Sequence, residues 1–281
     1  MELTRLVRAA LEEDVGTGDV TTEACVDHTL SGVAHIQAKA GLVVCGHAPA
    51  HEAFAQVGAQ YTAKVPDGQW VEPGTTIGVV EGPLRALLTG ERVALNFLMR
   101  LSGIASHTRH CVLHAGSLRV VDTRKTTPLH RALEKHAVRM GGAANHRFAL
   151  YDAVLIKENH IIAAGGVGPA IQRAKAAVDG RFDVQVEVEN MDELRAAIEA
   201  GADSVLLDNM DDVTLRSAVK IGKGKVLLEA SGGITPERLP RLEGIGLDRV
   251  SMGGLIHQAR WVDLSMRFQS SPGDGAKNGG E

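Results

Sequence analysis

The fold is decided by residues 183–233, which read DVQVEVENMDELRAAIEAGADSVLLDNMDDVTLRSAVKIGKGKVLLEASGG. Three short apolar runs are found here, DVQVEVE (183–189), SVLLD (204–208) and KVLLEA (225–230). They alternate with two segments of helical periodicity, MDELRAAIEA (191–200) and DVTLRSAVK (212–220). Nearly continuous apolar strands joined by amphipathic helices are typical of a parallel sheet that helices cover. The stretch therefore predicts three parallel strands with helical crossovers.

The same alternation continues on both sides of this stretch. Further strands are predicted at LRVVD (118–122), AVLIK (153–157) and DRVSM (248–252), and further helices at AIQRAKAAV (170–178) and PERLPRLE (236–243). This many successive units favours an α/β fold of the open, incomplete TIM-like barrel type. A doubly wound open sheet is the alternative. No GxGxxG follows any of these strands, which disfavours dinucleotide binding.

The N-terminal part of the chain has a different pattern of residues. Residues 1–15 and 84–114 have helical spacing, whereas short apolar runs separated by Gly and Pro-Asp-Gly turns fill residues 32–82 and predict a small β-rich unit. Residues 270–281 are polar and Gly-rich, which predicts a disordered tail.

Net charge, cysteine pattern and the length of apolar runs limit the classes of protein to which the chain can belong. A formal net charge of −4 disfavours a nucleic-acid binder. The three cysteines, Cys25, Cys45 and Cys111, are scattered and form no CxxC pair, as in a protein of a reducing compartment. The N-terminal segment lacks an apolar signal core, and no apolar run approaches the roughly 18–20 residues of a membrane span. We therefore expect a cytoplasmic protein that binds neither membranes nor nucleic acid.

Polar residues follow the predicted strands where each one ends. The ends read DTRK (122–125), KENH (157–160), Glu187 with Glu189, Asp208-Asn209, EASGG (229–233) and SMGG (251–254). In a parallel barrel the active site lies at the carboxyl ends of the strands. The sequence therefore predicts one shared site built from these residues.

Cations concentrate in one part of the chain. Residues 119–160 hold eight Lys and Arg against four acids, although the whole chain is acidic. Such a local excess of positive charge suits the binding of a small polyanion. Arg124, Lys125, Arg147 and Lys157 are candidates because they lie at strand ends or in Gly-rich connections. Helical spacing favours a solvated helix face for Arg131, Lys135 and Arg139 instead.

Two acids and two glycine pairs complete the prediction. Glu187 and Asp208 end adjacent strands and could hold Mg²⁺ together with substrate oxygens. The alternative is a salt bridge to Lys157 or to a neighbouring helix. Ser231 to Gly233 and Gly253-Gly254 would let the backbone approach a phosphate, each before a predicted helix.

A set of motifs resembles the quinolinate phosphoribosyltransferase family. They are DTRKTTP (122–128), LEKHAVRMGG (133–142), NHR (145–147), YDAVLIKENH (151–160), VEVEN (186–190), LLDNM (206–210) and EASGGIT (229–235). LEEDVGTGDVTT (11–22) and ERVALNFLMRLSGIAS (91–106) are similar as well. The resemblance runs in order from about residue 11 to residue 268.

The resemblance implies two domains and a dimer. An N-terminal α/β sandwich over 1–108 would be completed by a C-terminal helix over 258–269, and an open α/β barrel would occupy 109–257. In the implied homodimer, one subunit's N-terminal domain caps the partner's barrel, and assembly beyond the dimer is left open. The implied enzyme, a nicotinate-nucleotide diphosphorylase of the carboxylating type, transfers phosphoribose from phosphoribosyl pyrophosphate to quinolinate. It releases pyrophosphate and CO₂ and gives nicotinate mononucleotide for NAD synthesis.

The resemblance also assigns roles to residues. The quinolinate-binding set is Arg92, Thr123, Arg124, His146, Arg147 and Lys157, with Arg92 supplied across the dimer interface. The set for phosphoribosyl pyrophosphate is Lys125, Glu187, Asp208, Ser231, Gly232, Gly233, Gly253 and Gly254. Glu187 and Asp208 would bind Mg²⁺, partly through water, and Lys125, Lys157, Glu187 and Asp208 would be catalytic.

Two positions depart from the family pattern. Leu129 stands where Gly is usual after TTP, and His136 stands where Tyr is common. Neither replaces a charged ligand, so both bear on the shape of the loop after Arg124.

Three other functions are weighed. A relative with the same scaffold could use another acceptor, such as nicotinate or the substrate of the molybdenum-operon relatives. A non-catalytic protein could retain the pocket, although it would not need Glu187 and Asp208 together. A metal hydrolase is disfavoured because the histidines lack HxH and HExxH spacing.

Overall fold

The chain forms two compact units. The computed structural model describes residues 2–268, so the tail predicted for 270–281 lies outside the described residues. One unit contains residues up to Ser106 and those from Arg260 on, and the other contains His107–Ala259. The division falls within the long helix α4 (Leu84–Ala115).

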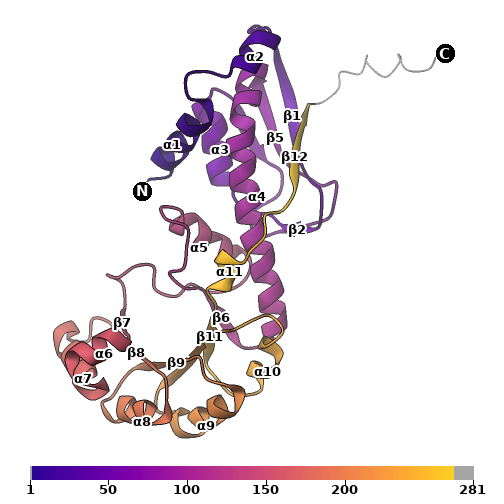
Figure 1. Ribbon diagram of the computed structural model, residues 1–281. Helices are drawn as coiled ribbons and strands as arrows, with labels where there is room; N and C mark the ends of the chain where they lie inside the picture. The colour runs from indigo at the N-terminus through magenta and orange to yellow at the C-terminus, as the bar shows by residue number, and fades with distance from the viewer. Residues whose placement is uncertain (1, 269–281) are drawn as a thin grey trace. The chain divides into compact units, whose positions relative to one another are not determined.

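The second unit is built on a six-stranded sheet (Figure 1). Its strands are β6 (Arg119–Val121), β7 (Val154–Ile156), β8 (Val184–Val188), β9 (Ser204–Asp208), β10 (Leu227–Ser231) and β11 (Arg249–Ser251). Their order is β6-β11-β10-β9-β8-β7, and every pairing is parallel. The last strand thus pairs with the first, while no ladder joins β6 to β7 among residues 2–268. All six predicted strands and the open α/β barrel are confirmed.

Helices accompany this sheet (Figure 1). They are α5 (Arg131–Met140), α6 (Glu158–Ala164), α7 (Val167–Val178), α8 (Met191–Glu199), α9 (Asp212–Gly222), α10 (Leu239–Glu243) and α11 (Gly254–His257). Of these, α7, α8 and α9 lie along the outer side of the sheet. Val186, Val205 and Leu228 are fully buried between sheet and helices. Each such side chain stabilises the fold by about 1.5–3 kcal/mol.

Capping fixes where two of these helices begin. The Asn190 side chain accepts hydrogen bonds from the backbone N–H groups of Asp192 and Glu193, and Asp211 accepts one from Thr214. An N-cap of this kind is worth about 1 kcal/mol. Because α8 and α9 begin right after β8 and β9, Glu187 and Asp208 are held at defined strand ends.

The first unit contains a four-stranded antiparallel sheet in the order β12-β1-β5-β3. These strands are β1 (Ser31–Ala38), β3 (Gln60–Ala63), β5 (Thr76–Pro83) and β12 (Leu264–Phe268), and β2 (Leu42–Val43) pairs separately with β4 (Trp70–Val71). Helices α1 (Leu3–Val15), α2 (Val20–Cys25) and α3 (His47–Gln56) belong to the same unit.

Two predictions for this unit are corrected. The helix expected over 258–269 does not form in its described part, residues 258–268; β12 instead pairs antiparallel with β1, placing Leu264 opposite Ala38. Apolar residues alternate in β12, with Leu264 and Met266 separated by Ser265, and that period favours a strand. Helix α3, inside the region expected to be β-rich, was not predicted. It buries Ala50, Ala53 and Phe54.

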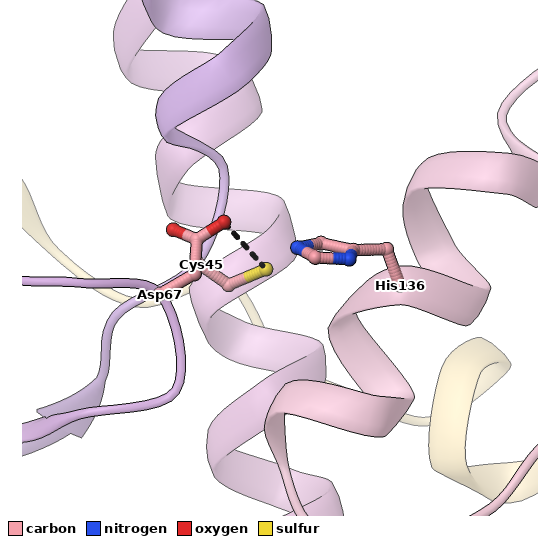
Figure 2. Close-up of side chains that lie close together, drawn as sticks. All are labelled: Cys45, Asp67 and His136. Atoms are coloured by element: carbon pink, nitrogen blue, oxygen red, sulfur yellow. Dashed lines mark hydrogen bonds between the residues drawn. The ribbon is translucent and has the colours of Figure 1, made fainter.

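The buried thiol of Cys45 lies two residues after the short strand β2 (Figure 2). Cys45 Sγ lies 3.9 Å from Asp67 Oδ2, and the Cys45 backbone N–H donates to Ser102 Oγ at 2.9 Å. His136, labelled in the same view, belongs to α5 of the second unit. There its Nδ1 lies 3.3 Å from Nη2 of Arg139.

Candidate active site

The carboxyl ends of the barrel strands surround a cavity of about 540 Å³. Its lining includes eleven of the residues singled out from the sequence: Thr123, Arg124, Lys125, His146, Arg147, Lys157, Glu187, Asp208, Ser231, Gly232 and Gly233. They come from the ends of β6 to β10 and from the loop between α5 and β7. The fold thus brings together side chains that lie more than one hundred residues apart in the sequence.

Two guanidinium groups dominate one wall. Nε of Arg124 is buried and has no hydrogen-bond partner among the described residues. Arg147 donates from Nη1 to the Ala153 carbonyl at 3.1 Å. Burial and the nearby Arg124 charge lower the pKa of Arg147, and Asp152 offsets this in part. Two like charges held together in this way suit a ligand that carries more than one carboxylate.

Acidic groups line the cavity as well. Lys157 Nζ lies 2.5 Å from Glu187 Oε2, so the salt bridge considered as the alternative does form. Burial and the Glu187 charge raise the pKa of Asp208, against the opposing effect of Lys157. Asp208 accepts a hydrogen bond from Asn209 Nδ2 at 2.7 Å but forms no salt bridge among the described residues. Carboxylates placed in this way are suitable ligands for a divalent cation.

Glycine is required on the third side. Gly232 has φ +83°, and a Cβ there would lie 2.1 Å from Asn209 Oδ1. A Cβ on Gly253 would lie 2.8 Å from Lys125 Cδ. Gly253 and Gly254 are not among the lining residues, and they lead directly into α11. The helix predicted to follow Gly233 begins only at Leu239.

Arg92 stands apart from the other predicted site residues. It lies on α4 in the first unit, where its side chain is exposed. Its contribution to the site of another subunit therefore stays a prediction.

Lys135 is corrected from a solvated helix residue to a buried one. Its side chain is 2% exposed, and Nζ lies 2.5 Å from Asp122 Oδ1. Nζ also donates to the His146 carbonyl at 3.0 Å, while Asp122 accepts the His146 backbone N–H at 2.8 Å. Burial raises the pKa of Asp122, and Lys135 opposes that effect. The pair therefore anchors the loop that carries His146 and Arg147.

The two departures from the family pattern have different consequences. Leu129 has φ +68°, a left-handed conformation that glycine adopts without strain. That conformation explains why Gly is usual at this position. His136 lies on α5 and contacts Arg139 at its Nδ1.

Three more of the predicted strand-end residues, Asn209, Glu229 and Ser251, also line the cavity. Leu155 and Leu206 line it as well and were not predicted. Glu229 is fully buried, and its Oε2 accepts hydrogen bonds from Gln185 and Arg249. Gln185 and Arg249 were not predicted either, although each is a polar residue within a strand.

Comparison with known proteins identifies the family. Residues 104–267 match the quinolinate phosphoribosyl transferase C-terminal domain, and residues 19–102 match the N-terminal domain. A probable nicotinate-nucleotide pyrophosphorylase (carboxylating) of Bacillus subtilis is 42% identical over 95% of this chain and 93% of its own length. A mitochondrial quinolinate phosphoribosyltransferase of Nicotiana glauca is 34% identical, over 96% of this chain and 83% of its own.

Solved structures agree. The nicotinate-nucleotide pyrophosphorylase of Francisella tularensis superposes with a TM-score of 0.91 at 40% identity, covering 95% of this chain and 96% of that one. Within residues 2–268, no helix is long and apolar enough to cross a membrane. The two domain matches, the near-complete relatives and the cationic cavity agree: the chain belongs to the quinolinate phosphoribosyltransferase family, the phosphoribosyltransferases that act on quinolinate in NAD synthesis.

Proposed function

We propose that the barrel cavity binds quinolinate through Arg124, Arg147 and Lys157 and places it beside phosphoribosyl pyrophosphate. The observation that carries this proposal is the pair of neighbouring guanidiniums, because Arg124 Nε is buried without a hydrogen-bond partner among the described residues. A buried charged donor is costly unless a ligand pairs with it. Thr123 and His146 line the same wall.

The second substrate is proposed to occupy the opposite side of the cavity. Lys125 and the backbone of Ser231, Gly232 and Gly233 would hold its phosphates, with Gly253-Gly254 nearby. Glu187 and Asp208 would hold Mg²⁺, partly through water. Both carboxylates line the cavity, and Asp208 forms no salt bridge among the described residues, which supports this assignment. When bound, Mg²⁺ supplies positive charge that neutralises the pyrophosphate leaving group.

The reaction follows from this arrangement. The pyridine nitrogen attacks the anomeric carbon as the bond from that carbon to pyrophosphate breaks. The pyridinium then accepts the electron pair of the adjacent carboxylate bond, CO₂ leaves, and the ring carbon takes up a proton. Lys125, Lys157, Glu187 and Asp208 are the proposed catalytic groups, since they would surround the reacting atoms. Orientation and electrostatic stabilisation supply most of the rate in such a site.

A homodimer with shared sites is proposed as the working form. Leu129, Leu150 and Tyr151 are 66%, 71% and 74% exposed, and they belong to the loops that carry the cations. Exposed apolar side chains on the loops of a binding site support an interface there. A second copy would cover them and bring its Arg92 to the cavity.

Mixed subunits test this sharing. Arg92→Ala and Arg124→Ala subunits are expected to be inactive separately, whereas a mixed dimer assembles one intact site and regains activity. Absence of any rescue in dimers proven to be mixed would contradict the role of Arg92 across the interface.

We also propose that the protein works in the cytoplasm. Its three cysteines, Cys25, Cys45 and Cys111, are free thiols, which suits a reducing compartment. Fractionation of cells expressing the full chain tests this, and recovery outside the cytoplasm contradicts it.

The function is tested by incubating the protein with quinolinate, phosphoribosyl pyrophosphate and Mg²⁺. Formation of nicotinate mononucleotide and pyrophosphate is expected. Nicotinate in place of quinolinate is expected to give little product, because it lacks the second carboxylate. Binding of quinolinate without pyrophosphate release would instead support a non-catalytic protein.

A further inference from the structure

The floor of the cavity contains a carboxylate that the reaction described above does not use. Glu229, on β10, is 0% exposed. Its Oε2 lies 2.9 Å from Gln185 Nε2, 2.5 Å from Arg249 Nε and 3.5 Å from His146 Nε2. Strands β8, β10 and β11 thus each supply one side chain to this cluster.

The hydrogen bonds of His146 define its tautomer. A backbone N–H can only donate, and that of Arg147 lies 2.8 Å from His146 Nδ1. Nδ1 is therefore an acceptor, and the ring proton is on Nε2. Nε2 lies 3.0 Å from Gln185 Oε1, to which it donates. Because both ring nitrogens are bound by the protein, His146 holds the loop in place.

The amide of Gln185 is oriented in turn by Glu229. Its Oε1 accepts from His146, so its Nε2 must point to a group that only accepts. An ionised carboxylate is such a group. Burial raises the pKa of Glu229, whereas the His146 hydrogen bond and the Arg249 charge act in the opposite direction and favour the ionised carboxylate. The direction of the whole relay is therefore set by the charge on Glu229.

We propose that Glu229 is a positioning residue for quinolinate binding, acting through Gln185 and His146 on the backbone of Arg147. The inference rests on the proposed role of Arg147 in binding quinolinate. The same backbone is fixed from the other side, where Asp122 accepts the His146 N–H and Lys135 donates to the His146 carbonyl. Loop 145–147 is thus clamped by two buried ionic groups.

The free oxygen of Glu229 adds a second effect. Its Oε1 is buried and accepts no hydrogen bond of good geometry among the described residues, although the Ser251 hydroxyl is near enough to lower the pKa of this carboxyl. An anion at the floor repels a carboxylate placed over it. The two carboxylates of quinolinate are thereby directed away from the floor and toward Arg124 and Arg147.

Glu229→Gln tests the proposal in the full chain. The variant keeps the shape and removes the charge that orients the relay. The KM for quinolinate is expected to rise at least about tenfold, as for a lost charged hydrogen bond, whereas the KM for phosphoribosyl pyrophosphate stays within about twofold. Loss of stability alone would not separate the two KM values in this way. Asp203→Asn is the matched control, because it also changes a carboxyl to an amide but lies where β9 begins. It should leave both KM values unchanged.

The tautomer gives an independent readout. In protein labelled with ¹⁵N-histidine, the His146 resonances, assigned by their loss in His146→Gln, should show a protonated Nε2 and an unprotonated Nδ1. Glu229→Gln should mix the two tautomers. If that variant does not fold, Gln185→Met breaks the same relay at its middle and is expected to give the same KM split.

The outcomes distinguish this inference from the function on which it rests. Wild-type KM for quinolinate together with an unchanged tautomer in Glu229→Gln, or in Gln185→Met where it replaces that variant, would overturn the positioning role. An unchanged KM in Arg147→Ala would overturn the proposed binding site instead. No turnover by the wild-type chain would overturn the function, while the tautomer measurement would still report on the relay.

Discussion

Acidic and basic residues occur both where the parallel strands begin and where they end, but they have different roles at the two edges of the sheet. At the strand starts, Asp203 pairs with Lys175 and accepts the Val184 N–H, and Asp248 pairs with Lys223 and accepts the Leu228 N–H. Each acid there is neutralised and joins two neighbouring strands.

At the strand ends the charges face the cavity, and the protein leaves some of them unpaired. Arg124 Nε has no partner among the described residues, and the pKa of Asp208 is raised by burial and by Glu187. A charge paired within the protein contributes to folding, whereas a charge without a partner in the protein is available to a ligand. This difference, more than the charge itself, separates the site from the scaffold.

The largest expected effect comes from removing a cation at the cavity end. Arg124→Ala and Lys157→Ala should each lower turnover at least about a thousandfold, which corresponds to roughly 4 kcal/mol. The protein should remain folded by circular dichroism, because neither side chain is in the core. Lys175→Ala is the control at the other end and should keep its activity. Near-normal turnover of quinolinate in either cavity variant would remove that residue from the site.

The next effect concerns stability. Lys135→Met leaves Asp122 as an unpaired buried charge, so the free energy of unfolding should fall by about 3–5 kcal/mol in urea titrations. Lys175→Met breaks the half-exposed pair with Asp203 and should cost less than about 1 kcal/mol. Equal losses in the two variants would show that burial does not distinguish the two pairs.

Acid unfolding should reveal Glu229. Its pKa in the folded protein, about 2, lies below its ordinary value of 4.5. Its stabilisation is therefore complete above pH 4.5 and is lost as the pH falls from 4.5 toward 2. The loss is on the order of 3 kcal/mol. Glu229→Gln should flatten this part of the pH–stability curve, and an unchanged slope would contradict the lowered pKa.

The smallest effect is at Leu129. Leu129→Gly should stabilise the protein by less than about 1 kcal/mol, because relief of the left-handed strain exceeds the added freedom of the unfolded chain. Leu129→Ala keeps a Cβ and so retains the strain. Thermal unfolding should rank Gly above Ala here, and the reverse order would show that φ is not strained.

Much of the barrel and of its site could be predicted from the sequence. Parallel strands buried on both faces leave continuous apolar runs, and parallel topology gathers the residues that follow them at one edge, including Lys157, Glu187 and Asp208. The pairing of Lys135 with Asp122 could not be foreseen, since helical spacing alone does not tell which face of α5 is buried.

Other features were missed because their signals are short. Helix α3 follows Gly46, which provides no side-chain cap, and it buries only Pro49, Ala50, Ala53 and Phe54. Gln185 and Arg249 lie within strand runs, and only the three-dimensional register brings them to the predicted strand-end residue Glu229. The period-two alternation of β12 was present, but the expectation of a helix came from the family resemblance.

The most direct test of the shared site is the electron density of crystals soaked in quinolinate. Density is predicted in the barrel cavity, with one carboxylate within hydrogen-bonding distance of Arg124 and Arg147 and none over Glu229. Quinolinate bound on another surface, with the cavity empty, would contradict the account.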